Sequence, residues 1–368
     1  MAAFDLEQYL AQGVRHILTG LTAAAGKNLK TAAFLARFAP AAQSARHRRA
    51  LLAAGGEHIP PFLIASITEQ CNLHCRGCYA RAGGVCCDGG ADGILTAAQW
   101  ADLFTQAAEL GISFILLAGG EPLLRQDVLA AAAQEKRIIF PVFTNGTLFS
   151  QDACALFLQN RNLMPVLSLE GDAAATDARR GDGVYRRLQG AMALLHQNGV
   201  LFGASITVTR VNLAAVLAED FLRALHAAGC RAVIYVEYAP VTQESQPLAL
   251  TDADRATLES RLAQLRAAQQ ELLLVSFPGD EKSSGGCLAA GRGFFHINPR
   301  GGAEPCPFSP YADTNLTQVP LRQALRSPLF RRLQEQGYLT QAHTGGCVLF
   351  PHADEVAALA QGREICRE

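Results

Sequence analysis

Three cysteines lie close together in the chain, where Cys71, Cys75 and Cys78 follow an apolar run at residues 62–67. Thiolates at this spacing can bind three irons of a [4Fe–4S] cluster from a single loop. The fourth iron of such a cluster then has no protein ligand and can bind a small molecule. The pattern therefore predicts redox chemistry at an iron–sulfur cluster.

A zinc site is the alternative interpretation of these thiols. It would need a fourth ligand, which Cys86 or Cys87 could provide, whereas His74 lies inside the motif and cannot readily fold back. Zinc sites favour two CxxC pairs, and this loop contains one. We therefore favour the iron–sulfur interpretation.

The remaining cysteines are of three kinds, and the first kind, Cys86 and Cys87, are expected to be ordinary loop thiols. The chain has eleven cysteines and no signal-peptide layout, so reduced thiols are expected rather than disulfides. Cys154 and Cys230 stand alone in apolar segments and are expected to be small buried side chains. The last quarter of the chain holds a possible second metal site, made of Cys287, Cys306, Cys347 and Cys366.

Alternating strand and helix patterns occupy residues 60–240. The predicted strands are 62–67, 112–117, 138–143, 164–169, 202–208 and 233–238. The predicted helices are 97–110, 126–136, 151–159, 184–197 and 215–228. Strands that are apolar on both faces and separated by helices predict a parallel sheet. Six such units predict an α/β fold, a partial (β/α)6 TIM-like barrel.

Polar and glycine residues follow the predicted strands. In strand order they are the cysteine loop, Gly119-Gly120-Glu121-Pro122, Asn145 with Gly146, and Ser168 with Glu170. Because the carboxyl ends of parallel strands share one edge, these residues are expected to meet in one site.

In this order the motifs resemble those of the radical S-adenosylmethionine (SAM) superfamily. The resemblance implies an enzyme in which the amino and carboxylate groups of SAM bind the open iron of a [4Fe–4S] cluster. It implies that an electron from the cluster cleaves SAM to a 5′-deoxyadenosyl radical, which abstracts hydrogen from a substrate. A reductant such as flavodoxin or ferredoxin is an implied partner.

The resemblance also implies SAM-binding roles for individual residues. Gly119, Gly120, Glu121 and Pro122 match the GGEP motif that meets the SAM ammonium group. Ser168 and Glu170 match positions that hydrogen-bond the ribose. Arg180 is the expected partner of the SAM carboxylate, although Arg179 and Arg186 are equally plausible by charge alone. Asn145 is expected near the adenosyl group, and Asn212 is a further candidate there.

One position departs from the family pattern. Many members have an aromatic residue immediately before the third cysteine, and here that residue is Gly77. The neighbouring aromatic residue is Tyr79. The adenine of SAM must therefore pack in another way.

The C-terminal cysteines resemble a second pattern. The spacing of Cys287 and Cys306, with a predicted β-hairpin at 296–302 between them, is similar to the opening of SPASM or twitch domains. The resemblance implies one auxiliary [4Fe–4S] cluster, with Cys347 as its third ligand. Cys366 could be the fourth ligand, but we favour an iron open to substrate. A zinc site or free thiols are the alternative.

A loop at residues 277–286 precedes these cysteines and is expected either to cover the barrel mouth or to be a solvated linker. Its Asp280 and Glu281, together with Glu237 at the end of the sixth predicted strand, are weak candidates for an acid or base. Tyr238, next to Glu237, is either a substrate contact or part of the framework.

The domain organisation has three predicted parts: a helical N-terminal extension at 1–57, the barrel at 58–270 and the auxiliary-cluster module at 271–368. The extension has a basic patch, expected to be a solvated helix face that covers the barrel, with membrane or partner docking as the alternative. The patch consists of Lys27, Lys30, Arg37, Arg46, Arg48 and Arg49.

Composition narrows the possible partners. The net charge of −1 does not favour nucleic-acid binding, and no apolar stretch is long enough to cross a membrane. We therefore expect a cytoplasmic protein with no membrane contact. The expected reaction is oxidation or cross-linking of a peptide or protein side chain, or of a small metabolite such as a tetrapyrrole or a nucleotide derivative. Recognition of a leader peptide is disfavoured because the N-terminal segment has no strand pattern. The competing class is a non-catalytic iron–sulfur electron carrier or scaffold.

Overall fold

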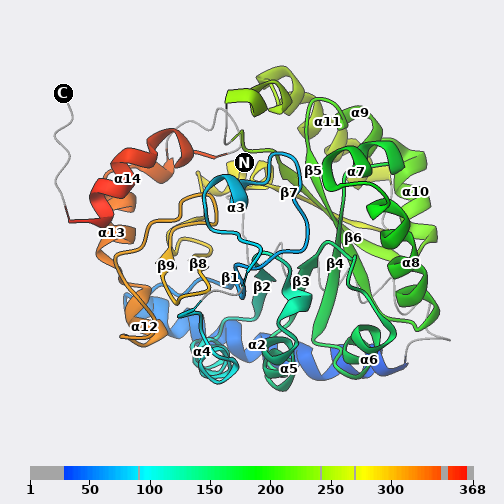
Figure 1. Ribbon diagram of the computed structural model, residues 1–368. Coiled ribbons are helices and arrows are strands. Elements are labelled where there is room, and N and C mark those ends of the chain that lie inside the picture. Colours follow the sequence, from blue (N-terminus) through cyan, green and yellow to red (C-terminus); the bar gives the residue numbers. More distant parts are fainter. Residues whose placement is uncertain (1–28, 90–91, 241–242, 269–270, 341–346, 363–368) are drawn as a thin grey trace.

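Seven parallel strands form the frame of the protein in the computed structural model, which describes residues 29–89, 92–240, 243–268, 271–340 and 347–362 (Figure 1). Strands that are consecutive in the chain are also neighbours in the sheet, from β1 at one side to β7 at the other. The strands are β1 (Phe62–Ser66), β2 (Phe114–Ala118), β3 (Phe140–Thr144), β4 (Leu163–Leu169), β5 (Phe202–Val208), β6 (Cys230–Glu237) and β7 (Leu273–Phe277). This open α/β barrel confirms the predicted fold class.

Helices on the outside connect these strands (Figure 1). They are α4 (Ala97–Leu110), α5 (Gln126–Gln134), α6 (Gln151–Gln159), α7 (Ala173–Arg180), α8 (Val184–Gln197), α9 (Leu213–Val216), α10 (Glu219–Ala227) and α11 (Asp252–Ala268). Local sequence explains their bounds: α4 begins with a capping box between Thr96 and Gln99 and ends at Gly111, whose φ of 91° suits glycine. Cys154 on α6 and Cys230 on β6 are buried, as predicted.

The seventh strand was not predicted as part of the barrel. Residues Leu273–Phe277 of β7 pair in parallel with Ala232–Val236 of β6, so they continue the sheet. The six strands predicted from the sequence end at residue 238, and this run was expected in the C-terminal module. It lies at one end of the sheet, and the glycine- and proline-rich residues that follow it show no helix pattern that would mark a further strand–helix unit.

A short hairpin extends the other end of the sheet. β8 (His296–Ile297) pairs in parallel with β1, and β9 (Ala303–Glu304) pairs antiparallel with β8. This confirms the hairpin predicted between Cys287 and Cys306. Beyond it lie α12 (Leu321–Ala324), α13 (Pro328–Glu335) and α14 (Ala353–Ala360), which pack beside the barrel (Figure 1).

The described part of the N-terminal extension is one helix, α2 (Leu29–Ala54), while residues 1–28, including Lys27, lie outside the described residues. It runs below the sheet (Figure 1), where Phe38 contacts Phe114 with ring centroids 6.0 Å apart. Two residues of the predicted basic face are not simply solvated. Arg48 donates to Ala108 O and Glu109 O, and Arg49 donates to Gly111 O. They satisfy carbonyl groups at the end of α4, a position that favours cations.

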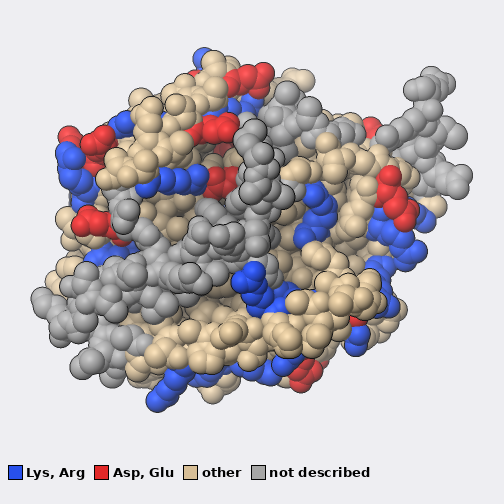
Figure 2. All heavy atoms as spheres, turned by 180° about the vertical axis from the view of Figure 1, so that it is seen from behind, with Lys and Arg blue, Asp and Glu red and all other residues tan. Residues whose placement is uncertain are grey.

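Two observations concern possible contacts with a membrane or with charged partners. No helix of the described residues is long and apolar enough to cross a membrane. The face seen in Figure 2 carries both basic and acidic side chains.

Candidate radical SAM site

The first cysteine loop follows β1 and lies at the carboxyl edge of the sheet. Cys71, Cys75 and Cys78 are half-buried, and Cys78 immediately precedes the short helix α3 (Tyr79–Ala82). Two backbone hydrogen bonds hold the loop: Cys71 N donates to Cys87 O at 3.1 Å, and Arg76 N donates to Arg179 O at 2.7 Å. The second bond joins the loop to α7, so the loop is fixed relative to the end of β4.

Cationic side chains surround these thiols. A hydrogen bond with the Cys86 thiol lowers the pKa of Cys71 to about 6, and Arg81 and Arg180 also lower it. Burial raises the pKa of Cys75, against the effect of Arg180 and Arg179. Cys86 was predicted to be an ordinary loop thiol, yet it contacts a predicted ligand. Metal ligands must be thiolates, which nearby arginines favour.

The thiols are not arranged around a single ion. Among the residues that the structure describes, no three His, Cys, Asp or Glu side chains lie close enough together to hold one metal ion. A tetrahedral zinc site needs all four ligands within about 2.3 Å of one centre. Thiols that each bind a different iron of a cluster need not meet at one centre, so this spacing is compatible with the predicted iron–sulfur cluster.

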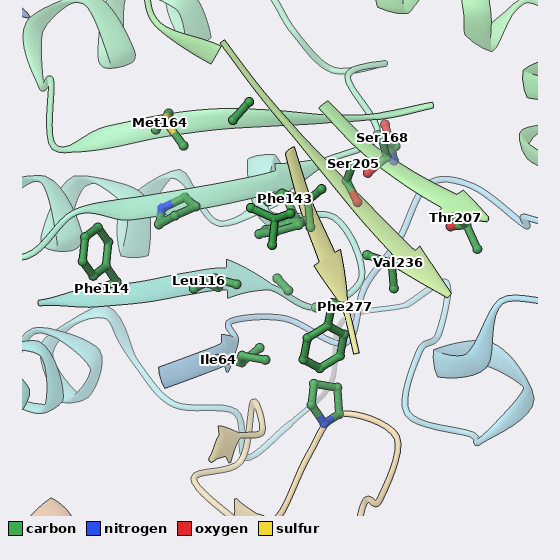
Figure 3. Close-up of a pocket in the computed structure, with 18 of the residues that line it drawn as sticks. Ile64, Phe114, Leu116, Phe143, Met164, Ser168, Ser205, Thr207, Val236 and Phe277 are labelled. Atoms are coloured by element: carbon green, nitrogen blue, oxygen red, sulfur yellow. The ribbon is translucent and has the colours of Figure 1, made fainter. Parts of the chain in front are cut away.

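A cavity of about 490 Å³ extends from this loop into the barrel (Figure 3). Most of its lining is apolar, and Figure 3 shows Phe114 and Met164 at one end, with Leu116 and Phe143 between the ends. At the other end lie hydroxyl groups of Ser168, Ser205 and Thr207 (Figure 3). Thr31, Phe34 and Leu35 of α2 also line the cavity. The predicted SAM site therefore opens into an apolar chamber.

The glycines after β2 bring two loops into contact. A Cβ on Gly119 would lie 2.4 Å from Thr68 O, and one on Gly120 would lie 2.0 Å from Gln70 O. Gly120 N donates to Thr68 O at 2.9 Å. Only glycine permits this approach, so the GGEP segment lies directly against the residues that lead into the cysteine loop.

Glu121 of this segment ties the second strand end to the third. Its carboxylate accepts hydrogen bonds from Thr144 Oγ1 at 2.7 Å, Asn145 N at 2.8 Å and Leu123 N at 3.0 Å. Burial raises its pKa to about 7, although these hydrogen bonds lower it. Asn145 in turn donates to Asn72 Oδ1 of the cysteine loop at 2.9 Å. Pro122 is buried and begins the 3₁₀ turn η1 (Pro122–Leu124).

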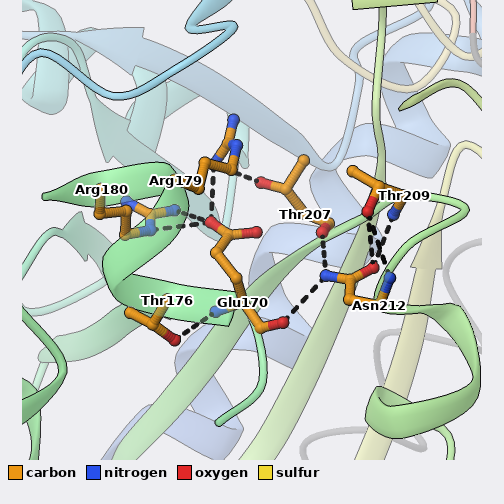
Figure 4. A network of polar contacts seen from close by, with 7 residues as sticks. All are labelled: Glu170, Thr176, Arg179, Arg180, Thr207, Thr209 and Asn212. Carbon is orange, nitrogen blue, oxygen red and sulfur yellow. Dashed lines mark hydrogen bonds and ion pairs between the residues drawn. The ribbon is translucent and has the colours of Figure 1, made fainter. Parts of the chain in front are cut away.

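A charged network lies after β4 (Figure 4). Glu170 Oε1 accepts from Arg179 Nη1 at 2.6 Å and from Arg180 Nε at 2.8 Å. Asn212 donates to Glu170 O at 2.9 Å, which joins the end of β5 to the network. Arg186 is exposed on α8. Of the three arginines that charge alone left open, the structure therefore brings two to the site.

This network leaves polar atoms for a ligand. Within the described residues, Glu170 Oε2 and Arg179 Nε are buried and have no hydrogen-bond partner. A buried polar atom without a partner costs about 1–3 kcal/mol, so such atoms indicate a bound molecule. A carboxylate oxygen suits a ribose hydroxyl, and a guanidinium NH suits a carboxylate. The site thus fits the cofactor implied by the motifs.

Tyr238 accounts for the glycine that departs from the family pattern. A Cβ on Gly77 would lie 2.1 Å from the Tyr238 hydroxyl, so the side chain at the end of β6 occupies this position. The ring also lies 5.9 Å from the Arg179 guanidinium carbon. The hydroxyl is buried, lines the cavity and has no hydrogen-bond partner among the described residues. No definite role for Tyr238 followed from the sequence, although Gly77 was the available signal.

The C-terminal cysteines form a separate, more enclosed group. Cys287 and Cys306 are buried, and Cys347 is half-buried. Burial is the largest cause that raises the pKa of each thiol, and Cys347 and Cys287 further raise the pKa of Cys306 through their charge. The structure therefore brings these three predicted ligands together. Cys366 lies outside the described residues.

An aromatic contact joins the two cysteine groups. Tyr79, next to Cys78, packs on Phe308, two residues after Cys306, with ring centroids 4.7 Å apart. Both rings also line the cavity that extends from the cysteine loop.

The three candidate acids or bases have different surroundings. Glu237 Oε1 accepts from Arg255 Nε at 2.6 Å. Asp280 accepts from Arg266 Nη2 at 2.8 Å and from Ser276 N at 2.8 Å. Glu281 lies beside Cys287, with which it forms a hydrogen bond. These contacts assign Glu237 and Asp280 to ion pairs and Glu281 to the second cysteine group.

Comparison with known proteins agrees with this geometry. The model of the Radical SAM superfamily matches residues 65–234. A pre-heme d1 synthase from Dinoroseobacter shibae is 30% identical over 155 residues, which are 41% of this chain and 37% of the relative. A PqqA peptide cyclase from Granulibacter bethesdensis is 26% identical over 67% of this chain and 68% of the relative. The match with the first relative thus spans well under half of that protein.

Among solved structures, SuiB of Streptococcus suis bound to S-adenosylmethionine has a similar fold. The TM-score is 0.66 at 18% identity, with 83% of this chain and 77% of that chain covered. The Radical SAM superfamily model thus covers the part of the chain that holds the cysteine loop, the GGEP segment and the charged network after β4.

Proposed function

We propose that this protein is a radical SAM enzyme. When bound, a [4Fe–4S] cluster and SAM supply a 5′-deoxyadenosyl radical that removes hydrogen from a substrate. Cys71, Cys75 and Cys78 are the proposed ligands of the cluster. The observation that carries the proposal is the position of buried, unpartnered polar atoms of Glu170 and Arg179 beside this cysteine loop.

Each loop around the site has a proposed task. The backbone of Gly119 and Gly120 meets the SAM amino group, while Glu121 fixes the loop through its three hydrogen bonds. Glu170 binds the ribose with help from Ser168. An arginine, Arg180 or its neighbour Arg179, binds the carboxylate of SAM.

We propose a substrate with a large apolar part. The cavity that continues from the SAM site is lined mainly by apolar side chains, and burying such surface gains about 25 cal/mol per Å². The relatives named above include a tetrapyrrole enzyme and a peptide cyclase, so both a small apolar molecule and an apolar peptide side chain fit. A small molecule is favoured because α2 lines the far end of the chamber and so limits its depth.

The C-terminal cysteines are proposed to hold one auxiliary [4Fe–4S] cluster. These cysteines lie beside the substrate chamber, and a cluster held there would supply an electron acceptor, which favours oxidation or cross-linking. A flavodoxin or ferredoxin is the proposed reductant, and the cytoplasm, which keeps thiols reduced, the proposed compartment.

Anaerobic reconstitution with iron and sulfide tests the activity. After addition of SAM and dithionite, the protein is expected to release 5′-deoxyadenosine, and the Cys71→Ala/Cys75→Ala/Cys78→Ala variant is expected to release none. If the reduced wild-type protein leaves SAM intact, the competing electron-carrier function is correct instead.

Candidate substrates can then be ranked by how much they stimulate SAM cleavage. Apolar small molecules are expected to stimulate most, and Leu116→Asp, which places a charge in the chamber, is expected to reduce that stimulation. Equal stimulation by polar and apolar candidates would argue against the apolar substrate.

A further inference from the structure

A carboxylate lies among the C-terminal cysteines. Glu281 belongs to the 3₁₀ turn η3 (Gly279–Ser284), which follows β7, and its side chain is 3% exposed. Its Oε2 accepts a hydrogen bond from Leu288 N at 3.3 Å, next to Cys287. The carboxylate is therefore anchored directly beside the first of the three thiols.

Glu281 also interacts with the thiols themselves. It forms a hydrogen bond with Cys287, and its charge acts on both Cys306 and Cys347. Buried carboxylates are normally paired with a cation or bound to a metal. Arg292 is a cation close to Glu281. The carboxylate also faces three groups that become anionic when they bind iron, and a cluster iron would lie between these anionic groups.

The adjacent carboxylate provides a contrast. Asp280 accepts from Arg266 at the surface and from Ser276 N, so its charge is neutralised away from the cysteines. Two consecutive acidic residues of η3 thus have different partners. The position of Glu281 is not a general property of an acidic loop.

We propose that the Glu281 carboxylate is the fourth protein ligand of the auxiliary cluster and binds one iron through oxygen. The inference rests on the proposed auxiliary cluster, and it replaces the sequence-based alternatives of Cys366 and an iron open to substrate. Carboxylate oxygen is a harder and less electron-donating ligand than thiolate. Ligand identity sets cluster potentials, so oxygen ligation is expected to make the cluster easier to reduce than four thiolates would.

The test uses the full chain with Cys71, Cys75 and Cys78 changed to alanine, so that only the auxiliary cluster remains. Glu281→Ala, Glu281→Cys and Cys366→Ala are added separately, and Asp280→Asn is the matched control for a neighbouring carboxylate. Iron content, electron paramagnetic resonance, Mössbauer spectra and the reduction potential are measured on anaerobically reconstituted protein. Circular dichroism shows that each variant is folded.

The expected result is about four irons in the background protein. Glu281→Ala should then lose about one iron on mild oxidation and give the spectrum of a three-iron cluster. Glu281→Cys should keep all irons and shift the potential to a more negative value. Asp280→Asn and Cys366→Ala should match the background.

The other outcomes are distinct. Loss of the fourth iron in Cys366→Ala, or unchanged spectra in Glu281→Ala, would overturn the ligand assignment alone. A background protein without iron would remove the auxiliary cluster itself, and with it this inference.

Discussion

The two cysteine groups are built in opposite ways. Cys71, Cys75 and Cys78 are half-buried in a loop with arginines nearby, whereas Cys287 and Cys306 are buried next to a carboxylate. The cationic surroundings of the first group stabilise thiolates. They also suit a cluster that binds an anionic group of a second molecule, such as the carboxylate of SAM. The second group has two buried thiols, the half-buried Cys347 and its own buried carboxylate, with Arg292 beside it. The contrast fits the proposed exchangeable ligand at the first group and the proposed closed set of protein ligands at the second.

The largest expected effect separates the two groups by task. Cys75→Ser should lower 5′-deoxyadenosine formation by at least about a hundredfold, beyond what loss of a group that only orients a ligand causes. Cys306→Ser should leave SAM cleavage measurable while it lowers the iron content. Liquid chromatography of the nucleoside and iron analysis measure both. Equal loss of cleavage in the two variants would show that the groups do not have separate tasks.

Glu170 places a negative charge between Arg179 and Arg180, and removal of this charge should strongly affect the site around the first cysteine group. Glu170→Gln breaks a pair in which Glu170 is 2% exposed, and loss of a buried charge partner costs about 3 kcal/mol. Urea unfolding measures this change, and calorimetry should show weaker SAM binding. Asp220→Asn is the control, because its pair with Arg223 is exposed and worth little. Similar losses in both variants would mean that the network is not a special feature of the site.

Variants of two tyrosines test whether the site beside the first cysteine group holds a polar group that the fold itself does not use. Tyr238→Phe removes a buried hydroxyl that has no hydrogen-bond partner in the described part of the chain, and it should raise the free energy of unfolding by about 1 kcal/mol. Tyr235→Phe removes a hydroxyl that donates to Val216 O at 3.0 Å and should lower it by a similar amount. Denaturant unfolding of the SAM-free protein gives both values. A loss of stability in Tyr238→Phe would show that its hydroxyl already serves the fold.

The smallest expected effect concerns the attachment of the C-terminal module. Glu57 accepts from Arg322 Nε at 2.8 Å, and this hydrogen bond lowers the pKa of Glu57. Because the folded pKa is depressed, the stabilisation is present above the ordinary value of 4.5 and is lost as the pH falls through the folded value.

Glu57→Gln should therefore lower stability by about 1 kcal/mol at pH 7, since Arg322 is largely exposed, and by less at pH 3, where more of the carboxylate is protonated. Thermal unfolding at the two pH values measures the difference. The exposed Glu219, which pairs with Arg261, serves as the control and should change stability less. An equal loss at both pH values would mean that packing rather than charge matters here.

The sequence predicted the barrel and the motifs well because they are local signals. Three helices have the predicted bounds, since apolar periodicity and capping residues such as Ser150 before α6 lie in consecutive residues. Because the motifs follow successive strands, the sequence predicted that they lie at one edge of the sheet. The superfamily match agrees with that order, while the roles of the individual residues remain predictions.

What the sequence did not reveal depends on distant contacts. The approach of Tyr238 to Gly77 and that of Arg49 to Gly111 join residues far apart in the chain. Glu281 could be named as an acid from its type, but its place beside Cys287 depends on how η3 folds back from β7. Charge alone could not separate Arg179 from Arg180, and the structure explains why, because both bind the same carboxylate oxygen.

The helix that lines the far end of the chamber has a consequence for selectivity. α2 contributes Phe34 and Leu35 from outside the barrel, at a distance from both cysteine groups. A substrate that contacts these two side chains can enter the chamber only to a fixed depth. That depth decides which carbon atom of the substrate lies beside the nucleoside of SAM. Replacing Phe34 by a smaller or larger residue would then move the point of attack along the substrate, although no residue of the reaction centre had changed.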